Sequence, residues 1–168
     1  MRSQIRNIVM AALMAALACV ATMVIQIPSP LQGYINLGDC VVLVSGWMLP
    51  LGYGVFAAAL GSLLADLFAG YAIYAPATFI IKGLMALIAF FLYRVIRKRG
   101  PQLLALLISG ICAELLMAVG YFVFEGFLYG FGPSLVNIPA NCIQGAAGLV
   151  FGILLAKTFE KSGILKSE

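Results

Sequence analysis

Charged residues are scarce in this sequence, and histidine is absent from it. Of the 168 residues, only 10% are charged and 64% are hydrophobic. A soluble domain usually carries about 25% charged residues, so this chain has too little polar surface to cover a water-soluble globule. The composition therefore excludes a soluble enzyme, a disordered region and a disulfide-stapled secreted domain. It also excludes a membrane β-barrel, whose lumen face needs a polar residue at every second position.

Cysteine is infrequent, and its positions do not suggest chemistry. Cys19, Cys40, Cys112 and Cys142 each lie inside an apolar run, without close pairs or metal-ligand spacing. This pattern favours small buried side chains over disulfides or metal ligands. Because there is no histidine, Ser-His and Cys-His catalysis and histidine-based metal sites are excluded as well. We therefore expect no enzyme activity, no metal and no cofactor.

The net charge of +4 comes from a few basic positions. All lysines and arginines except Lys82 lie near the N-terminus, at residues 94–99 or at residues 157–166. Long apolar stretches separate these places, which indicates membrane topology rather than nucleic-acid binding. The positive-inside rule places both termini and residues 94–99 in the cytoplasm.

Proline, glycine and charged breaks divide the chain into six apolar segments. An even number of crossings must separate the N-terminus from residues 94–99, and this stretch suits four helices, which leaves two for the remainder. We predict an all-α integral membrane protein, a single domain over residues 1–168, formed by a compact bundle of six transmembrane helices. The predicted helices cover residues 5–26, 37–49, 52–70, 77–96, 102–125 and 137–157.

The first two of these segments differ from ordinary transmembrane helices, one in its basic start and the other in its short length. The first begins with basic residues like a signal peptide, but its apolar run is long enough to span and no polar domain follows. We interpret it as the first transmembrane helix. The second rises only ~20 Å against ~30 Å of hydrocarbon, so it spans only where the membrane thins or where protein surrounds its ends.

Small residues line one face of the first predicted helix. Ala11, Ala15, Ala18 and Thr22 follow one another at helical spacing, with Ala12 and Ala16 beside them. Such a ridge lets another helix approach closely. That helix could belong to the same bundle or to another protein, and both interpretations stay open.

Ionisable side chains inside the membrane are few, and each is costly there. Asp66 and Lys82 fall near neighbouring ends of the third and fourth segments, where the favoured interpretation is a structural ion pair. The alternative is that Lys82 contacts a ligand. Glu114 lies near the middle of the fifth segment and must be protonated, paired or hydrogen-bonded.

Polar groups gather toward the predicted outer ends of the fifth and sixth helices, and the nearby connections supply tyrosines. The amides are Asn137, Asn141 and Gln144, and the tyrosines are Tyr34, Tyr71, Tyr74 and Tyr129. This chemistry predicts a pocket for a small, flat, hydrogen-bonding solute. An interfacial aromatic belt with hydrogen bonds between helices is the alternative.

Three stretches resemble the substrate-binding S component of energy-coupling factor (ECF) vitamin transporters. They are residues 33–39 (GYINLGD), residues 61–67 (GSLLADL) with Gly70 and Tyr71, and residues 76–83 (PATFIIKG). They are most similar to the riboflavin-type group, which includes carriers of hydroxymethylpyrimidine and pyridoxine. The resemblance covers almost the whole chain, but its motifs are weakly specific for the substrate.

The resemblance implies a subunit of the cell membrane that captures a scarce vitamin outside the cell. It implies docking through Ala11, Ala15 and Ala18 onto a transmembrane coupling subunit that two ATP-binding cassette ATPases drive. A stand-alone small carrier or channel subunit acting as a homo-oligomer is the alternative. By position, the implied substrate-binding residues are Tyr34, Asn36, Lys82, Glu114, Tyr121, Asn137, Asn141 and Gln144.

Overall fold

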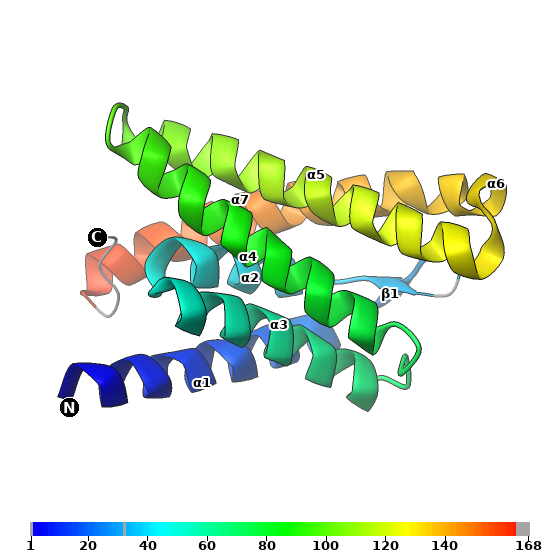
Figure 1. Cartoon of the computed structure of the whole chain (residues 1–168), viewed down its shortest axis with the longest axis horizontal. Helices are drawn as coiled ribbons and strands as arrows, with labels where there is room; N and C mark the ends of the chain where they lie inside the picture. The colour runs from blue at the N-terminus through cyan, green and yellow to red at the C-terminus, as the bar shows by residue number, and fades with distance from the viewer. Residues whose placement is uncertain (1, 32, 164–168) are drawn as a thin grey trace.

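The computed structural model describes residues 2–31 and 33–163, and its long helices run roughly along one direction (Figure 1). The start of α1, the end of α7 and the α4–α5 turn lie at one end, which we call the basic end. The β1–β2 hairpin, the α3–α4 turn and α6 lie at the opposite end, which we call the hairpin end. The elements are α1 (Arg2–Val24), β1 (Ile27–Pro28), β2 (Tyr34–Ile35), α2 (Gly38–Met48), α3 (Leu51–Phe68), α4 (Ala75–Arg97), α5 (Gln102–Tyr129), α6 (Phe131–Ser134), the 3-10 turn η1 (Leu135–Asn137) and α7 (Ile138–Ser162).

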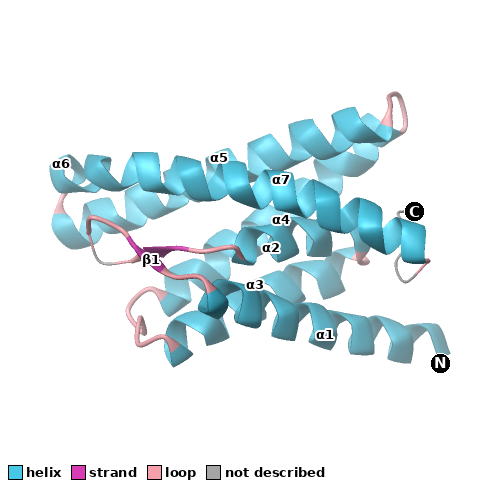
Figure 2. Ribbon diagram, turned by 180° about the vertical axis from the view of Figure 1, so that it is seen from behind, coloured by secondary structure: helices cyan, strands magenta, loops and turns pink. Residues whose placement is uncertain are grey.

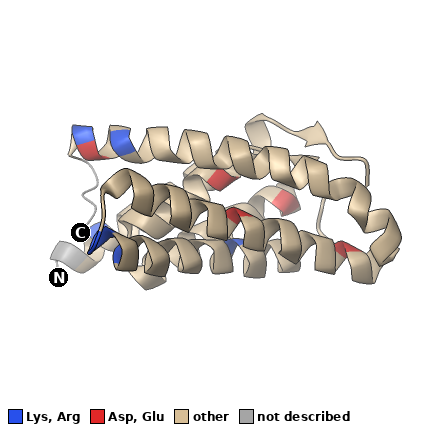
Figure 3. Ribbon diagram, turned by 90° about the horizontal axis from the view of Figure 1, so that it is seen from above, with Lys and Arg blue, Asp and Glu red and all other residues tan. Residues whose placement is uncertain are grey.

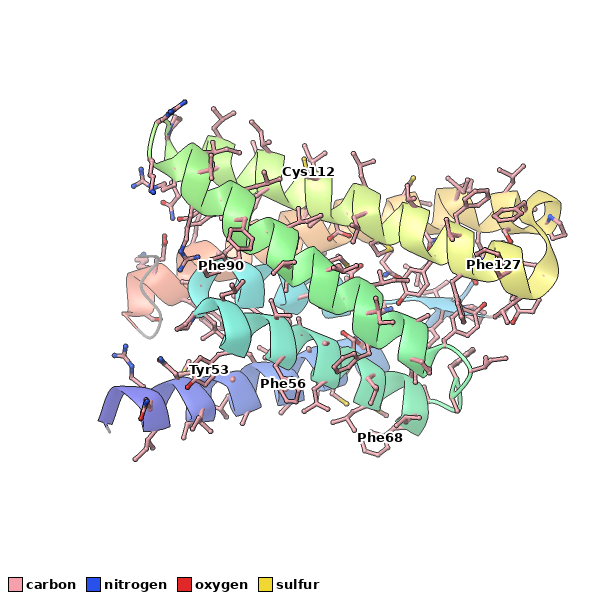
Figure 4. The ribbon with its side chains drawn as sticks, viewed as in Figure 1. Tyr53, Phe56, Phe68, Phe90, Cys112 and Phe127 are labelled. Atoms are coloured by element: carbon pink, nitrogen blue, oxygen red, sulfur yellow. The ribbon has the colours of Figure 1, made fainter. Side chains whose placement is uncertain are left out.

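Within the described residues, five helical stretches are long and apolar enough to cross a membrane. They lie in α1, α3, α4, α5 and the α6–α7 segment, and α2 adds a shorter apolar helix. Large apolar side chains cover the outside of the bundle, and Figure 4 shows Phe56, Phe68 and Phe127 at its periphery. An apolar exterior is what lipid contact requires. The prediction of an all-α, multi-pass membrane bundle of six principal helices is therefore confirmed.

Prolines and glycines set the helix ends. Pro50 and Pro101 directly precede α3 and α5, while Pro76 and Pro139 lie in the first turns of α4 and α7. Proline suits these places because the first helical N–H groups have no partner within the helix. Gly130 ends α5 with a φ of 91°, a conformation that glycine adopts without a steric penalty.

The short helix α2 occupies the centre of the bundle. All of its residues are buried, and it contacts α1, α3, α4 and α7. A helix enclosed on every side is apolar all round, which explains the run of valine and leucine at residues 41–44. Because protein rather than lipid surrounds most of α2, its short length is tolerated.

The alanine ridge of α1 packs inside the bundle. Ala15 and Ala18 are buried, and a Cβ on Gly61 of α3 would collide with the carbonyl oxygen of Ala15 and lie 2.9 Å from the Cβ of Ala18. Glycine at position 61 thus permits the close approach of α1 and α3. Thr22 continues the same buried face beside Gly38.

This packing corrects the expected docking face of Ala11, Ala15 and Ala18. Ala15 and Ala18 already contact α3, and Ala11 is half-buried against the core, so this face is not free for another protein. Among the residues of α1 whose side chains the structure describes, the exposed small ones are Ala12 and Ala16, one helical turn apart and beside the buried face. The sequence spacing identified a close-packing surface but not which helix covers it.

Two features of the hairpin end were not predicted. The strands β1 and β2 form an antiparallel hairpin in which Ile27 pairs with Ile35 and Pro28 with Tyr34. Figure 2 shows this hairpin between the α5–α7 side of the bundle and the α1–α3 side. In addition, α5 continues to Tyr129, and α6 lies where a loop was expected.

Candidate functional site

A small pocket lies at the hairpin end, covered by the hairpin and bounded by α3, α4, α5 and α7. Its volume of about 40 Å³ is enough for a few water molecules. A planar ring of vitamin size therefore enters only when the covering residues move. The lining residues are Ser29, Gly33, Tyr34, Ile35, Asn36, Asp66, Tyr71, Tyr74, Thr78, Tyr121, Glu125, Asn137, Asn141 and Gln144.

Three tyrosines form an aromatic wall of the pocket. The ring centroids of Tyr34 and Tyr71 are 4.8 Å apart, and those of Tyr71 and Tyr74 are 6.4 Å apart in an edge-to-face arrangement. Burial, together with the charge of Asp66, raises the pKa of the Tyr34 hydroxyl. Burial and a hydrogen bond with Tyr129 likewise raise the pKa of Tyr74. Both hydroxyls therefore stay protonated at physiological pH, and each donates to a carboxylate, Tyr34 to Asp66 and Tyr74 to Glu125.

Two carboxylates face the same pocket. Asp66 accepts a hydrogen bond from the Tyr34 hydroxyl at Oδ1 (2.8 Å), while Glu125 accepts one from Asn137 Nδ2 at Oε1 (2.8 Å). Asp66 is 6% exposed and Glu125 3% exposed. Within the described chain, Asp66 Oδ2 and Glu125 Oε2 have no hydrogen-bond partner. Buried polar atoms normally have one, so these oxygens remain available to a ligand.

Beneath the pocket, a buried network joins α4, α2, α7 and the hairpin. Lys82, which is 3% exposed, forms an ion pair with Oδ1 of the fully buried Asp39. Gln144 Nε2 donates to Asp39 Oδ2 (2.8 Å), and the backbone N–H of Asn36 donates to Gln144 Oε1 (3.0 Å). Asn36 in turn accepts a hydrogen bond from the Gly38 N–H (2.9 Å). The network fixes the orientation of the Asn36 and Gln144 side-chain amides, because in each of them the oxygen accepts a hydrogen bond and the nitrogen donates one.

Comparison with known proteins identifies the family. The model of the ECF-type riboflavin transporter, S component, matches residues 2–161. The chain belongs to this family. It is thus an S component of an ECF transporter and a multi-pass protein of the cell membrane, and its family is one of transporters rather than enzymes.

The S component is also similar to individual proteins. It is 32% identical over 134 residues to a Pyrococcus woesei protein described as lying in the gap 3′ region, covering 79% of this chain and 87% of the relative. It is 35% identical over 51 residues to the thiamine precursor transporter HmpT of Lactococcus lactis subsp. cremoris (strain MG1363), covering 30% of this chain and 31% of HmpT.

A solved S component of a bacterial ECF transporter shares the fold of this chain. The TM-score is 0.72, and the match covers 94% of this chain and 97% of the other. The sequence identity is 22%, so this similarity shows the fold alone.

Most of the residues predicted to bind substrate lie around the pocket of this S component. The structure shows that these residues line the pocket, and their contact with a substrate stays a prediction. The predicted residues that line the pocket are Tyr34, Asn36, Tyr121, Asn137, Asn141 and Gln144.

The predicted ion pair between Asp66 and Lys82 is wrong. Lys82 is paired with Asp39 in the described structure, whereas Asp66 accepts the Tyr34 hydroxyl. The physical reason is that α2 packs against α4 and presents Asp39 to Lys82 in the interior. Lys82 lies behind the pocket wall, with Nζ 5.4 Å from the centroid of the Tyr121 ring.

Glu114 was predicted near the middle of its helix and among the substrate-binding residues, but it does not line the pocket. It is buried, and it faces α7 beside Asp39. A Cβ on Gly148 would lie 2.7 Å from the Asp39 Cβ and 2.8 Å from Glu114 Oε1, so glycine provides the space for both carboxyl groups. Glu125, several turns further along the same face of α5, lines the pocket instead. Its position on the same face as Glu114 was the available signal in the sequence.

Proposed function

We propose that this S component is the high-affinity substrate-binding subunit of an ATP-driven ECF importer. It captures a small planar water-soluble vitamin, or a precursor of one, outside the cell and delivers it to the cytoplasm. The observation that carries this proposal is a polar, tyrosine-walled pocket covered by a hairpin at one end of a membrane bundle. A transmembrane coupling subunit and two ATP-binding cassette ATPases supply the energy.

The distribution of charge supports capture from outside. Figure 3 shows lysine and arginine gathered at the basic end, whereas several acidic residues lie within the bundle. By the positive-inside rule the basic end faces the cytoplasm, so the pocket at the hairpin end faces outward. Both termini then lie in the cytoplasm.

The chemistry of the pocket favours a pyrimidine or pyridine vitamin. Amides and tyrosine hydroxyls suit ring nitrogens and hydroxyl groups, and the aromatic wall suits a flat ring. Within the described lining there is no lysine or arginine to clamp a phosphate. Hydroxymethylpyrimidine or a pyridoxine-like compound is favoured, with the larger riboflavin next. The partial similarity to HmpT, whose name refers to a thiamine precursor, supports the same choice.

The test is to purify the S component and to identify any co-purifying small molecule by mass spectrometry. Isothermal titration with hydroxymethylpyrimidine, pyridoxine, riboflavin and pyridoxal phosphate then ranks the candidates. We expect a dephosphorylated compound to bind most tightly. Tightest binding of the phosphate ester would contradict the proposed pocket chemistry. Co-purification with ATPase subunits, as opposed to a homo-oligomer alone, distinguishes the importer from a stand-alone carrier.

A further inference from the structure

The pocket combines two buried carboxylates with no basic side chain in its described lining. Asp66 Oδ1 accepts a hydrogen bond from Tyr34, and Glu125 Oε1 accepts from Asn137 and Tyr74, whereas the second oxygen of each carboxylate has no partner among the described residues. Taking an ionised carboxylate out of water is costly unless a counter-charge or several donors compensate. The two unpaired carboxylate oxygens can therefore accept a hydrogen bond from a ligand, and a cationic donor compensates their charge best.

A run of tyrosine rings connects the two carboxylates. Asp66 contacts Tyr34, whose ring packs on Tyr71; Tyr71 packs on Tyr74, whose hydroxyl lies 3.4 Å from Glu125 Oε1. The negative faces of aromatic rings attract a cation within about 6 Å of the ring centroid. Carboxylates at both ends of such a run provide the hydrogen-bond acceptors that recognise an organic ammonium ion.

Lys82 does not supply the missing positive charge. It is paired with Asp39 in the network beneath the pocket and is not among the lining residues, and its Nζ lies 5.4 Å from the centroid of the Tyr121 ring, which does line the pocket. The other lysines and arginines in the described part of the chain lie at the basic end (Figure 3). A positive charge for the pocket must therefore come from the solute.

We propose that the substrate carries a positively charged nitrogen, as an aminomethyl group or a protonated heteroaromatic ring, and that Asp66 and Glu125 recognise it. This rests on the proposed function as a vitamin-binding subunit and narrows its substrate class. An N⁺–H group donates to Asp66 Oδ2 or Glu125 Oε2 in a charge-assisted hydrogen bond, and the ring stacks on the tyrosine wall. The covering hairpin then closes over a neutralised site.

The experiment compares compounds that differ only in an alcohol or an amine. Pyridoxine is matched with pyridoxamine, and hydroxymethylpyrimidine with aminomethylpyrimidine, by isothermal titration at pH 7 into purified protein. A hydrogen bond to a charged group exceeds a neutral one by enough to predict about tenfold tighter binding of the amine in at least one pair. This measurement needs no variant.

Two variants then locate the effect. In Asp66→Asn and in Glu125→Gln the preference for the amine should fall to about threefold or less, because an amide does not neutralise an ammonium ion. Glu160→Gln is the matched control, since Glu160 lies in the last turn of α7, at the basic end, where Gln102 Nε2 donates to it (2.6 Å). This control should keep the full preference.

The outcomes separate this inference from the proposed function. If the alcohols bind as tightly as the amines, the inference is overturned and the vitamin-binding function stands. If the amine preference survives unchanged in both variants, the assignment to Asp66 and Glu125 is overturned. If none of the four compounds binds and none co-purifies, the proposed pyrimidine or pyridine specificity fails, and this inference fails with it.

Discussion

Asp39 and Lys82 come from different helices and meet in the interior of the bundle, where Gln144 occupies the second oxygen of the carboxylate. A buried pair of this kind adds little over apolar residues of the same size, but removing one partner strands the other charge. From the sequence we predicted that Lys82 forms an ion pair and that Asp66 is its partner. Helical spacing within α3 and α4 did not reveal that α2 lies against α4 and supplies a closer carboxylate.

Neutralising Asp39 should therefore destabilise the protein strongly. We expect Asp39→Asn to cost about 3–5 kcal/mol and to lower the thermal unfolding temperature in detergent. The double variant with Lys82→Met should recover part of the loss. Glu114→Gln is the control, because it removes a carboxyl group that lies beside Asp39 without an ion-pair partner in the described structure. A large loss in Asp66→Asn with none in Asp39→Asn would restore the original pairing.

Asn141 and Gln144 separate ligand contact from structural support. Asn141 Nδ2 lines the pocket and has no hydrogen-bond partner within the described residues, whereas Gln144 is bonded to Asp39 and Asn36. Leaving a polar ligand group unpaired costs ~1–3 kcal/mol, so Asn141→Ala should weaken binding roughly 5- to 150-fold with little change in unfolding temperature. Gln144→Ala should lower both the affinity for the ligand and the unfolding temperature. Titration and thermal unfolding of the two variants check this, and unchanged affinity in Asn141→Ala would remove Asn141 from the site.

At the scale of elements, the sequence predicted the long helices well because proline, glycine and charge mark their ends. It could not predict the hairpin, since two-residue strands leave almost no period-2 pattern. The hairpin depends on distant contacts, among them the Leu31 N–H donating to Asn137 (3.2 Å) and Asn36 donating to Gln144. The side of α2 that carries Asp39 was equally hidden, because a helix buried all round shows no amphipathic face.

The Tyr34–Asp66 hydrogen bond should hold the hairpin closed over the pocket. Tyr34→Phe keeps the ring but removes the donor to Asp66, so we expect faster hydrogen–deuterium exchange in residues 27–36. The unfolding temperature should change little, because the rest of the bundle keeps its contacts. Tyr53→Phe, on α3 away from the pocket (Figure 4), is the control. Equal exchange in the wild type and Tyr34→Phe would show that other contacts hold the hairpin.

At the scale of the whole molecule, transport requires the bundle to present a surface to its coupling subunit. The buried ridge of Ala15 and Ala18 is occupied by α3, which leaves Ala12 and Ala16 as the small exposed residues of α1. Small residues in a lipid-facing helix let a partner helix approach closely. We therefore propose that the importer docks through this outer side of α1, which is the helix predicted from the sequence but a different face of it.

Placing tryptophan on either side of α1 tests this assignment. Ala16→Trp should leave vitamin binding and the unfolding temperature unchanged, because its side chain points away from α3, but it should abolish uptake into cells that express the coupling subunit and ATPases. Ala15→Trp should instead lower the unfolding temperature, since overpacking at a contact this close to Gly61 forces the helices apart. Its loss of uptake would then follow from misfolding. Normal uptake by a well-expressed Ala16→Trp variant would exclude this side of α1 as the docking surface.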